Sequence, residues 1–144
     1  MNTIEDVSPS QYRALAEFRY HIRKFMHFSE RGARAAGLEP QQHQLLLTIK
    51  GFAGEGDGPT IGYVAERLKL RHHSTVELID RMEERQMVYR RAGEDDRRHV
   101  IVGLTAGAEA ILTNLSSQHI TEIRRMGPDL VAALQAVLTC RTLN

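Results

Sequence analysis

Two groups of basic side chains lie close together in the sequence, between residues 71 and 98. The first, Arg71-His72-His73, opens a segment with helical periodicity, and the second, Arg97-Arg98, lies in a short turn between two β-type runs. Cationic side chains in the first turn of a helix oppose the helix dipole, which favours acidic residues there. A bound phosphate would resolve this conflict, because free backbone N–H groups and positive side chains would both face it. The chemistry that we expect from these residues is recognition of a phosphate backbone.

Each group also has an ordinary structural interpretation, as a solvated helix face or as a charged hairpin turn. Together the two groups favour DNA, because an arginine at the tip of a protruding hairpin suits insertion into a narrow minor groove. Three acids, Glu94, Asp95 and Asp96, come directly before the two arginines. A carboxylate there could aim an arginine or anchor the hairpin on the helical unit.

The predicted DNA contacts are the outward positions of the helix and the basic positions of the hairpin. Helix side chains would reach base edges or phosphates, and Glu77 could accept a hydrogen bond from cytosine N4. The strand arginines would meet phosphates, and the tip would enter the groove. The full set of predicted contacts is Arg71, His72, His73, Ser74, Val76, Glu77, Arg81, Arg90, Arg91, Asp96, Arg97 and Arg98.

A helix-turn-helix followed by a hairpin is the arrangement that would position these residues. Thr60 is a good N-cap for a helix over 61–68, and the turn Lys69-Leu70 leads to a second helix over 71–86. The inward face of that second helix is predicted to hold Thr75, Leu78, Ile79 and Met82. The runs Val88–Ala92 and His99–Leu104 predict strands, the second with Val100, Val102 and Leu104 on one face and His99, Ile101 and Gly103 on the other.

Helices are also predicted on both sides of this unit. Ser8 can cap the start of a long helix, and Gln11 would complete a capping box with it. Gly37 is the predicted end of this helix. A further helix begins at Pro40, and the glycine-rich stretch 51–59 predicts a loop. After Thr105 we expect a helix to about Arg125, a break at Gly127-Pro128, and a last helix from Pro128 to Cys140.

Composition limits the class of protein. A chain of 144 residues is long enough for one domain with a sizeable core, and its formal net charge of +1 does not by itself indicate a polyanion partner. No apolar run approaches the roughly 20 residues of a membrane span, and the first residues do not resemble a signal peptide. A single cysteine, Cys140, excludes an internal disulfide and suits a reducing compartment, so a cytoplasmic protein is expected.

The hairpin carries the most specific resemblance to a known family. Asp96-Arg97-Arg98 followed by Val100, Val102, Leu104 and Thr105 resembles the D-x-R wing and the Leu-Thr strand end of the MarR family of winged helix-turn-helix regulators. Residues 38–49, with Gln42, are similar to the opening of that family's second helix, and residues 78–83 are similar to the end of its recognition helix. The resemblance extends over nearly the whole chain.

This resemblance implies a fold and a function. The fold would be mainly α with a small β-hairpin wing, as a single domain over 1–144. Helices within 8–37 and 105–144 would form the dimerisation region, and 40–104 would form the DNA-binding lobe. The protein would be a homodimeric transcription regulator on double-stranded DNA, a repressor that reads a palindromic operator with half-sites about 34–36 Å apart. No cofactor and no membrane partner are expected.

The resemblance also implies a small aromatic or phenolic effector that lowers the affinity for DNA. Its pocket would lie near the first two helices, with His21, Phe25 and His43 as wall residues, although for His43 the interpretation as a hydrogen-bonded helix residue is slightly favoured. Several departures from the family pattern leave the operator sequence and the effector open. Glu39 replaces a threonine, His43 stands where an aromatic residue is common, and the glycine loop before Pro59 is longer than usual. Arg71-His72-His73 replaces a serine-rich start, and Gln86 replaces a glycine.

Other functions are weighed against this one. The sequence has no nucleophile elbow, P-loop, dinucleotide fingerprint or zinc-hydrolase motif, so we do not expect an enzyme. Seven histidines invite a metal-responsive regulator, but no pair has ordinary ligand spacing within a helix, and no metal ligand is assigned. Cys140 invites a redox-responsive one. A winged helix that binds another protein is the remaining alternative, and the basic residues favour DNA over it.

Overall fold

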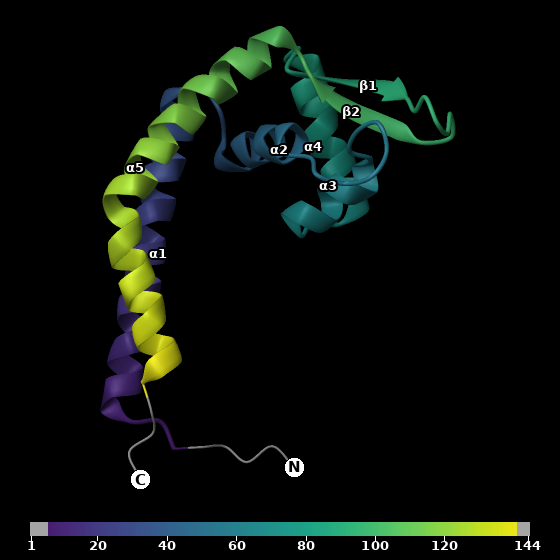
Figure 1. The fold of residues 1–144 in the computed structure, drawn as a ribbon. Coiled ribbons are helices and arrows are strands. Elements are labelled where there is room, and N and C mark those ends of the chain that lie inside the picture. The colour runs from purple at the N-terminus through teal and green to yellow at the C-terminus, as the bar shows by residue number, and fades with distance from the viewer. Residues whose placement is uncertain (1–5, 141–144) are drawn as a thin grey trace, which may run out of the picture. The chain divides into compact units, whose positions relative to one another are not determined.

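The computed structural model describes residues 6–140 and shows a mainly α-helical chain with a small β-hairpin (Figure 1). The predicted fold class is confirmed. The described residues divide into two compact units, one with residues up to Arg31 and from Ser117 on, the other with Gly32–Ser116. The elements in chain order are α1 (Pro9–Ala35), α2 (Pro40–Lys50), α3 (Ile61–Leu68), α4 (His72–Glu84), β1 (Val88–Ala92), β2 (Val100–Leu104) and α5 (Ala106–Thr139).

Residues 32–116 fold around a continuous apolar core. The inward side chains of α2, α3 and α4 meet there with one residue from each strand and with the start of α5. The predicted inward face of α4 is confirmed, since Thr75, Leu78, Ile79 and Met82 are all buried. The core side chains are Ala33, Leu38, Leu45, Leu46, Ile49, Val64, Leu78, Ile79, Met82, Val88, Val102, Ala108, Leu112 and Leu115.

The helix start signals operate as the sequence predicts. Gln11 N–H donates to Ser8 Oγ and Ser8 N–H donates to Gln11 Oε1, so α1 begins with a full capping box. Thr60 Oγ1 accepts from Tyr63 N–H at the start of α3. Thr105 Oγ1 accepts from Ala108 N–H at the start of α5 and donates to the carbonyl of Gln86. Thr105 therefore joins the start of α5 to the end of α4.

Helix α4 is shorter than the predicted range 71–86 at both ends. Arg71 is its N-cap rather than its first residue, and the chain leaves the helix after Glu84. Gln86 then takes a left-handed conformation with φ 57°, while Met87 N–H bonds to Met82 O at 2.9 Å. Glycine is usual at such a position because it lacks the Cβ that crowds this conformation.

The predicted break at Gly127-Pro128 is wrong, because α5 continues through both residues to Thr139. Proline removes one backbone donor and crowds the preceding turn. Gly127 has no Cβ, which relieves the clash between the proline ring and the residue before it. Met126 and Ala133, on either side, are 5% and 8% exposed, so packing of the flanking turns holds the helix together.

The hairpin is a two-stranded antiparallel sheet in which Val88 pairs with Leu104 and Ala92 with Val100. The predicted start of the second strand at His99 is one residue early. Ile101 and Val102 are 3% and 1% exposed, so both faces of β2 are covered at this point. The segment before α3 covers the second face of β2. Thr60 forms a β-bridge with Ile101, and the N–H of Val102 donates to Pro59 O at 2.9 Å.

In the other unit, α1 and α5 lie side by side (Figure 1). The Nε2 atom of His119 lies 2.8 Å from Ser29 Oγ, and the rings of Phe25 and Phe28 pack edge-on against the same imidazole. No helix among residues 6–140 is both long enough and apolar enough to cross a membrane.

Candidate nucleic-acid interface

The first turn of α4 has no side-chain cap. Arg71 stands at the N-cap in an extended conformation, with φ −67° and ψ 153°, and its side chain makes no capping hydrogen bond. Its own carbonyl is well bound, because Thr75 donates to it from both the backbone N–H and Oγ1. Arg71, His72 and His73 are exposed. The first-turn N–H groups therefore have no side-chain cap, and three exposed basic residues lie at the same end of the helix.

The outward positions of α4 differ in exposure. Glu77 and Arg81 are exposed, as predicted, whereas Ser74 and Val76 are half-buried. Asp80 and Glu83 farther along the helix are both bound by Arg90 from β1, whose Nη1 lies 3.0 Å from Glu83 Oε1. This pairing offsets part of the negative charge of Asp80 and Glu83 and fixes the base of the hairpin to the helix.

Arg91 on the same strand is also bound within the lobe. Its Nη1 donates to Asp57 Oδ2 at 2.8 Å and its Nη2 donates to the Asp57 carbonyl at 2.7 Å. The hydrogen bond from Arg91 is the main reason that the pKa of Asp57 lies below its ordinary value, and a second from Glu94 N–H acts in the same direction. Both strand arginines thus already hold carboxylates in the isolated chain.

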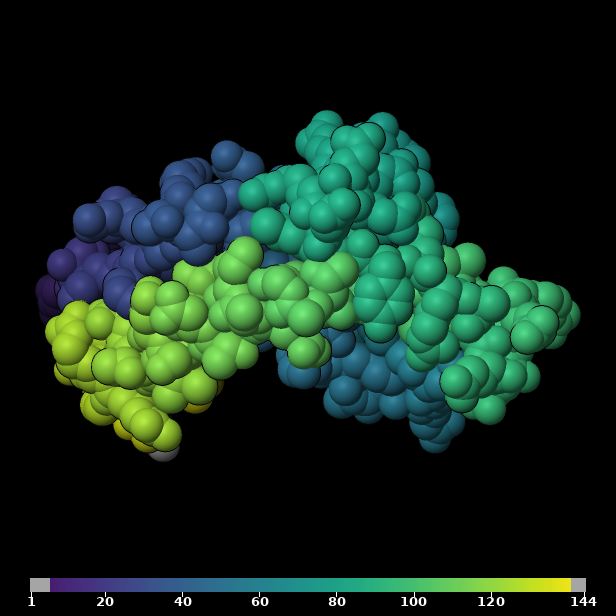
Figure 2. Space-filling view, turned by 90° about the horizontal axis from the view of Figure 1, so that it is seen from above, coloured from purple at the N-terminus to yellow at the C-terminus, as the bar shows by residue number. Residues whose placement is uncertain are grey.

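The tip of the hairpin is built around Asp96. Its Oδ1 accepts from Arg98 N–H and Nε–H, both at 3.0 Å, and its Oδ2 accepts from Arg98 Nη2 at 2.9 Å. These hydrogen bonds from Arg98 hold the pKa of Asp96 below its ordinary value. Arg98 nevertheless remains 89% exposed, and Arg97 is exposed beside it. Figure 2 shows this tip standing clear of the rest of the lobe.

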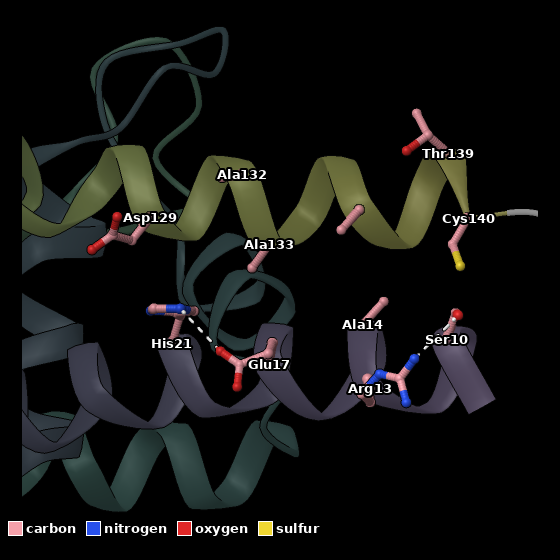
Figure 3. Close-up of a pocket in the computed structure, with 11 residues that line it drawn as sticks. Ser10, Arg13, Ala14, Glu17, His21, Asp129, Ala132, Ala133, Thr139 and Cys140 are labelled. Atoms are coloured by element: carbon pink, nitrogen blue, oxygen red, sulfur yellow. Dashed lines mark hydrogen bonds and ion pairs between the residues drawn. The ribbon is translucent and has the colours of Figure 1, made fainter.

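The three predicted effector residues lie in different surroundings. His21 lines a hollow of about 550 Å³ between α1 and α5, with Glu17 beside it and Asp129 on the opposite helix (Figure 3). Its Nε2 lies 3.6 Å from Glu17 Oε2, and its buried Nδ1 has no hydrogen-bond partner among the described residues. Phe25 packs on His119 in the same unit, whereas His43 is a buried residue of α2 in the other.

Sequence reasoning missed the residues that hold the hairpin in place. Asp57 lies 34 residues before Arg91, inside a stretch that composition marks only as a loop. Asp80 and Glu83 read as outward positions of an ordinary helix. Nothing local to any of these residues indicates a partner. Among residues 6–140, no cluster of three histidine, cysteine or acidic side chains is arranged to hold a metal ion.

Comparison with known sequences finds a similarity to one family. The sequence profile of the MarR family matches residues 36–99, which span α2 to the hairpin tip. No curated protein sequence matches significantly.

Solved structures give the fold. AbsC, a MarR family transcriptional regulator from Streptomyces coelicolor, is similar with a TM-score of 0.73 and 21% identity over 94% of each chain. A MarR variant from E. coli in complex with operator DNA has a TM-score of 0.65 and 19% identity over 93% of this chain and 96% of its own. CouR from Rhodococcus jostii, bound to p-coumaroyl-CoA, has a TM-score of 0.62 and 17% identity over 84% and 88%. Residues 36–99 therefore resemble the MarR family of transcription regulators in sequence, and the described chain has the winged-helix fold of the solved members.

Proposed function

We propose that this protein is a sequence-specific regulator that binds a palindromic operator in double-stranded DNA as a homodimer. One observation carries the proposal: the uncapped, basic first turn of α4 and the exposed Arg98 of the wing belong to one compact lobe. The first would enter a major groove by its N-terminal end, and the second would enter the neighbouring minor groove. The E. coli relative in complex with operator DNA supports this assignment.

The structure also suggests how the contacts divide. Arg71, His72, His73, Ser74, Val76, Glu77 and Arg81 remain the predicted contacts of α4, and Asp96, Arg97 and Arg98 those of the wing. Arg90 and Arg91 already bind carboxylates of the lobe, so we assign them to holding the wing and give them at most a secondary part in phosphate binding.

The homodimer is supported by an unpaired apolar surface. Exposed side chains follow one stripe of α5 at steps of three and four residues, with Gly127 in the middle of the stripe. A stripe of this size on a helix marks a surface that another protein covers. The stripe on α5 consists of Ile120, Ile123, Val131, Leu134 and Leu138, and exposed Tyr12, Leu15, Tyr20 and Met26 lie on α1.

We further propose that the protein is a repressor that a small aromatic or phenolic ligand releases from DNA. The relative bound to p-coumaroyl-CoA supports a ligand of this kind. Of the three proposed wall residues, His21 lines the hollow between α1 and α5, where its imidazole could contact a ligand. Phe25 and His43 remain predictions.

Selection from a random-sequence duplex library with the purified full chain tests DNA binding. Sequencing of the retained duplexes should give a palindrome whose half-sites lie about one helical turn apart, roughly 34–36 Å. Titration of aromatic carboxylates and phenols against the labelled duplex should then raise the apparent Kd. Recovery of no enriched duplex at low salt would refute the DNA-binding function. If a palindrome is recovered but no ligand changes the Kd for it, only the proposed effector is refuted, and the DNA-binding function stands.

A further inference from the structure

The loop between α2 and α3 contacts the wing through the side chain and the carbonyl of Asp57. Asp57 Oδ2 accepts from Arg91 Nη1 and from the backbone N–H of Glu94, each at 2.8 Å. The Asp57 carbonyl accepts from Arg91 Nη2 at 2.7 Å. Arg91 donates from the side chain of a residue in β1, and Glu94 donates from the backbone just after β1 ends. Asp57 thus joins both parts of the hairpin to the loop.

The residues that follow Asp57 lie beside β2 and form backbone contacts with it. Val102 N–H donates to Pro59 O at 2.9 Å, and Thr60 forms a β-bridge with Ile101. Gly58 lies so close to the strand that a Cβ there would be 2.5 Å from Ile101 Cγ2. The approach of this segment to the hairpin therefore depends on glycine at position 58, and it places the Asp57 carboxylate beside Arg91.

The loop and the tip are connected through a short path. Glu94, whose N–H donates to Asp57, lies in the turn at the tip of the hairpin. In the same turn, Gly93 N–H donates to His99 O, and Arg98 donates to Asp96. Two strands alone form a marginal sheet in water. Because Arg91 and Asp57 are 35% and 22% exposed, solvent screens the ion pair only in part, and its fork geometry gives it direction.

We propose that Asp57 is a positioning residue for DNA binding, which sets the direction in which the wing presents Arg98. Asp57 does not touch DNA in this proposal, and it acts through Arg91 and Glu94. The inference rests on the proposed DNA-binding function. It assigns a role to the glycine-rich loop, which otherwise is only a connection between α2 and α3.

A double-mutant cycle tests the proposal, with the duplex that the wild-type chain selects from the random library as the probe. Asp57→Asn keeps the size of the side chain and removes its charge and one acceptor. We expect it to raise the Kd about tenfold, since residues in one hydrogen-bonded network couple at this scale. In the background of Arg98→Ala, the same substitution should have a much smaller effect, because the main side chain that Asp57 aims is then absent.

Two controls separate positioning from a general loss of fold. Glu55→Gln removes the same charge from an exposed position of the same loop and should leave the Kd unchanged. Amide hydrogen exchange at Glu94 should become faster in Asp57→Asn while amides of α4 keep their protection. If Asp57→Asn melts below the assay temperature, Arg91→Gln replaces it in the same cycle.

The outcomes are distinct. An Asp57→Asn chain that binds as tightly as the wild type would overturn the proposal, and so would an equal loss with and without Arg98, since that pattern indicates a general effect on the lobe. A wild-type chain that selects no duplex would instead refute the DNA-binding function, and the positioning role with it.

Discussion

Three arginines of the hairpin show how partners decide what one side-chain type can do. Arg90 and Arg91 are 24% and 35% exposed and bind acids of α4 and of the loop. Arg98 is 89% exposed, and its one carboxylate partner, Asp96, lies two residues away on the same tip. The first two therefore fix the wing, and the third is aimed outward with most of its surface available to a ligand.

We expect Arg98→Ala to weaken binding to the selected duplex by about 1–3 kcal/mol and to lower the salt dependence of the affinity, since a groove or phosphate contact is lost. Fluorescence anisotropy at several salt concentrations measures both. Arg34→Ala removes the same charge from an exposed position near the end of α1, beyond the exposed apolar residues of that helix, and is the matched control. Equal affinity for the Arg98 variant and the control would exclude Arg98 from the contacts.

The stability of the fold at acid pH should depend on the ionisation of the Asp57 carboxyl. Its pKa is below the ordinary value of 3.8 in the folded chain, chiefly because Arg91 donates to it. A lowered folded-state pKa means that the carboxylate stabilises the fold above about pH 3.8 and that this contribution is lost as the pH falls below that value.

The measurable consequence is a pH-dependent difference in Tm. The wild type should melt above Asp57→Asn at about pH 6, and the difference in Tm should be smaller at about pH 3, below the ordinary pKa of the carboxyl. Thermal melts monitored by circular dichroism at fixed protein concentration give the comparison, with Glu55→Gln as the control that shows no such gap. A gap of the same size at both pH values would mean that the carboxylate charge does not contribute.

At the scale of elements, α5 is the case in which packing outweighs local preference. A helix through Gly127-Pro128 lacks one backbone hydrogen bond and contains the two residues least suited to a helix interior. It persists because the flanking turns bury Met126 and Ala133. Most of the stability of such a helix comes from its tertiary contacts.

Pro128→Ala should therefore raise the free energy of unfolding by about 1–3 kcal/mol, because alanine restores a donor and removes a clash without touching a buried side chain. Urea denaturation at one protein concentration measures this. Pro9→Ala is the control, since proline at a first helical position costs little and its loss should change stability by less than about 0.5 kcal/mol. A less stable Pro128 variant would show that the fold uses a proline-specific bend.

At the scale of the whole molecule, the two units differ in how well each encloses its apolar residues. Residues 32–116 bury a continuous core. Among the described residues of the other unit, 6–31 and 117–140, ten large apolar side chains are at least 41% exposed: Val7, Tyr12, Leu15, Tyr20, Met26, Ile120, Ile123, Val131, Leu134 and Leu138. A surface of this kind is expected where a second copy of the chain packs.

Leu134→Glu should separate the proposed dimer, because it would bury an unpaired carboxylate at the interface. A cost of about 3 kcal/mol would raise the dimer Kd roughly a hundredfold. Sedimentation velocity over a concentration series measures the effect, and the affinity for the palindromic duplex should fall as the two half-sites become unlinked. Gln135→Glu adds the same charge at an exposed position outside the stripe and should remain dimeric. Dimerisation unaffected by Leu134→Glu would place the interface elsewhere.

The sequence by itself determined what depends on short-range geometry. Caps at Ser8, Thr60 and Thr105 act within three residues, so their residue types predict where α1, α3 and α5 begin. Apolar spacing predicted the buried face of α4 in the same way. The pairing of Asp96 with Arg98 spans two residues, and it was accessible to sequence reasoning for that reason.

Only the tertiary structure decided what depends on contacts distant in sequence. Packing around Met126 and Ala133 carried α5 through a proline that local preference treats as a stop. The segment at Pro59 covered the second face of β2, which alternation within the strand does not reveal. Asp57 reached Arg91 across 34 residues, and Arg90 reached Asp80 and Glu83 from another element. A side chain's type states what it can bind, and the fold decides which partner is near enough to be bound.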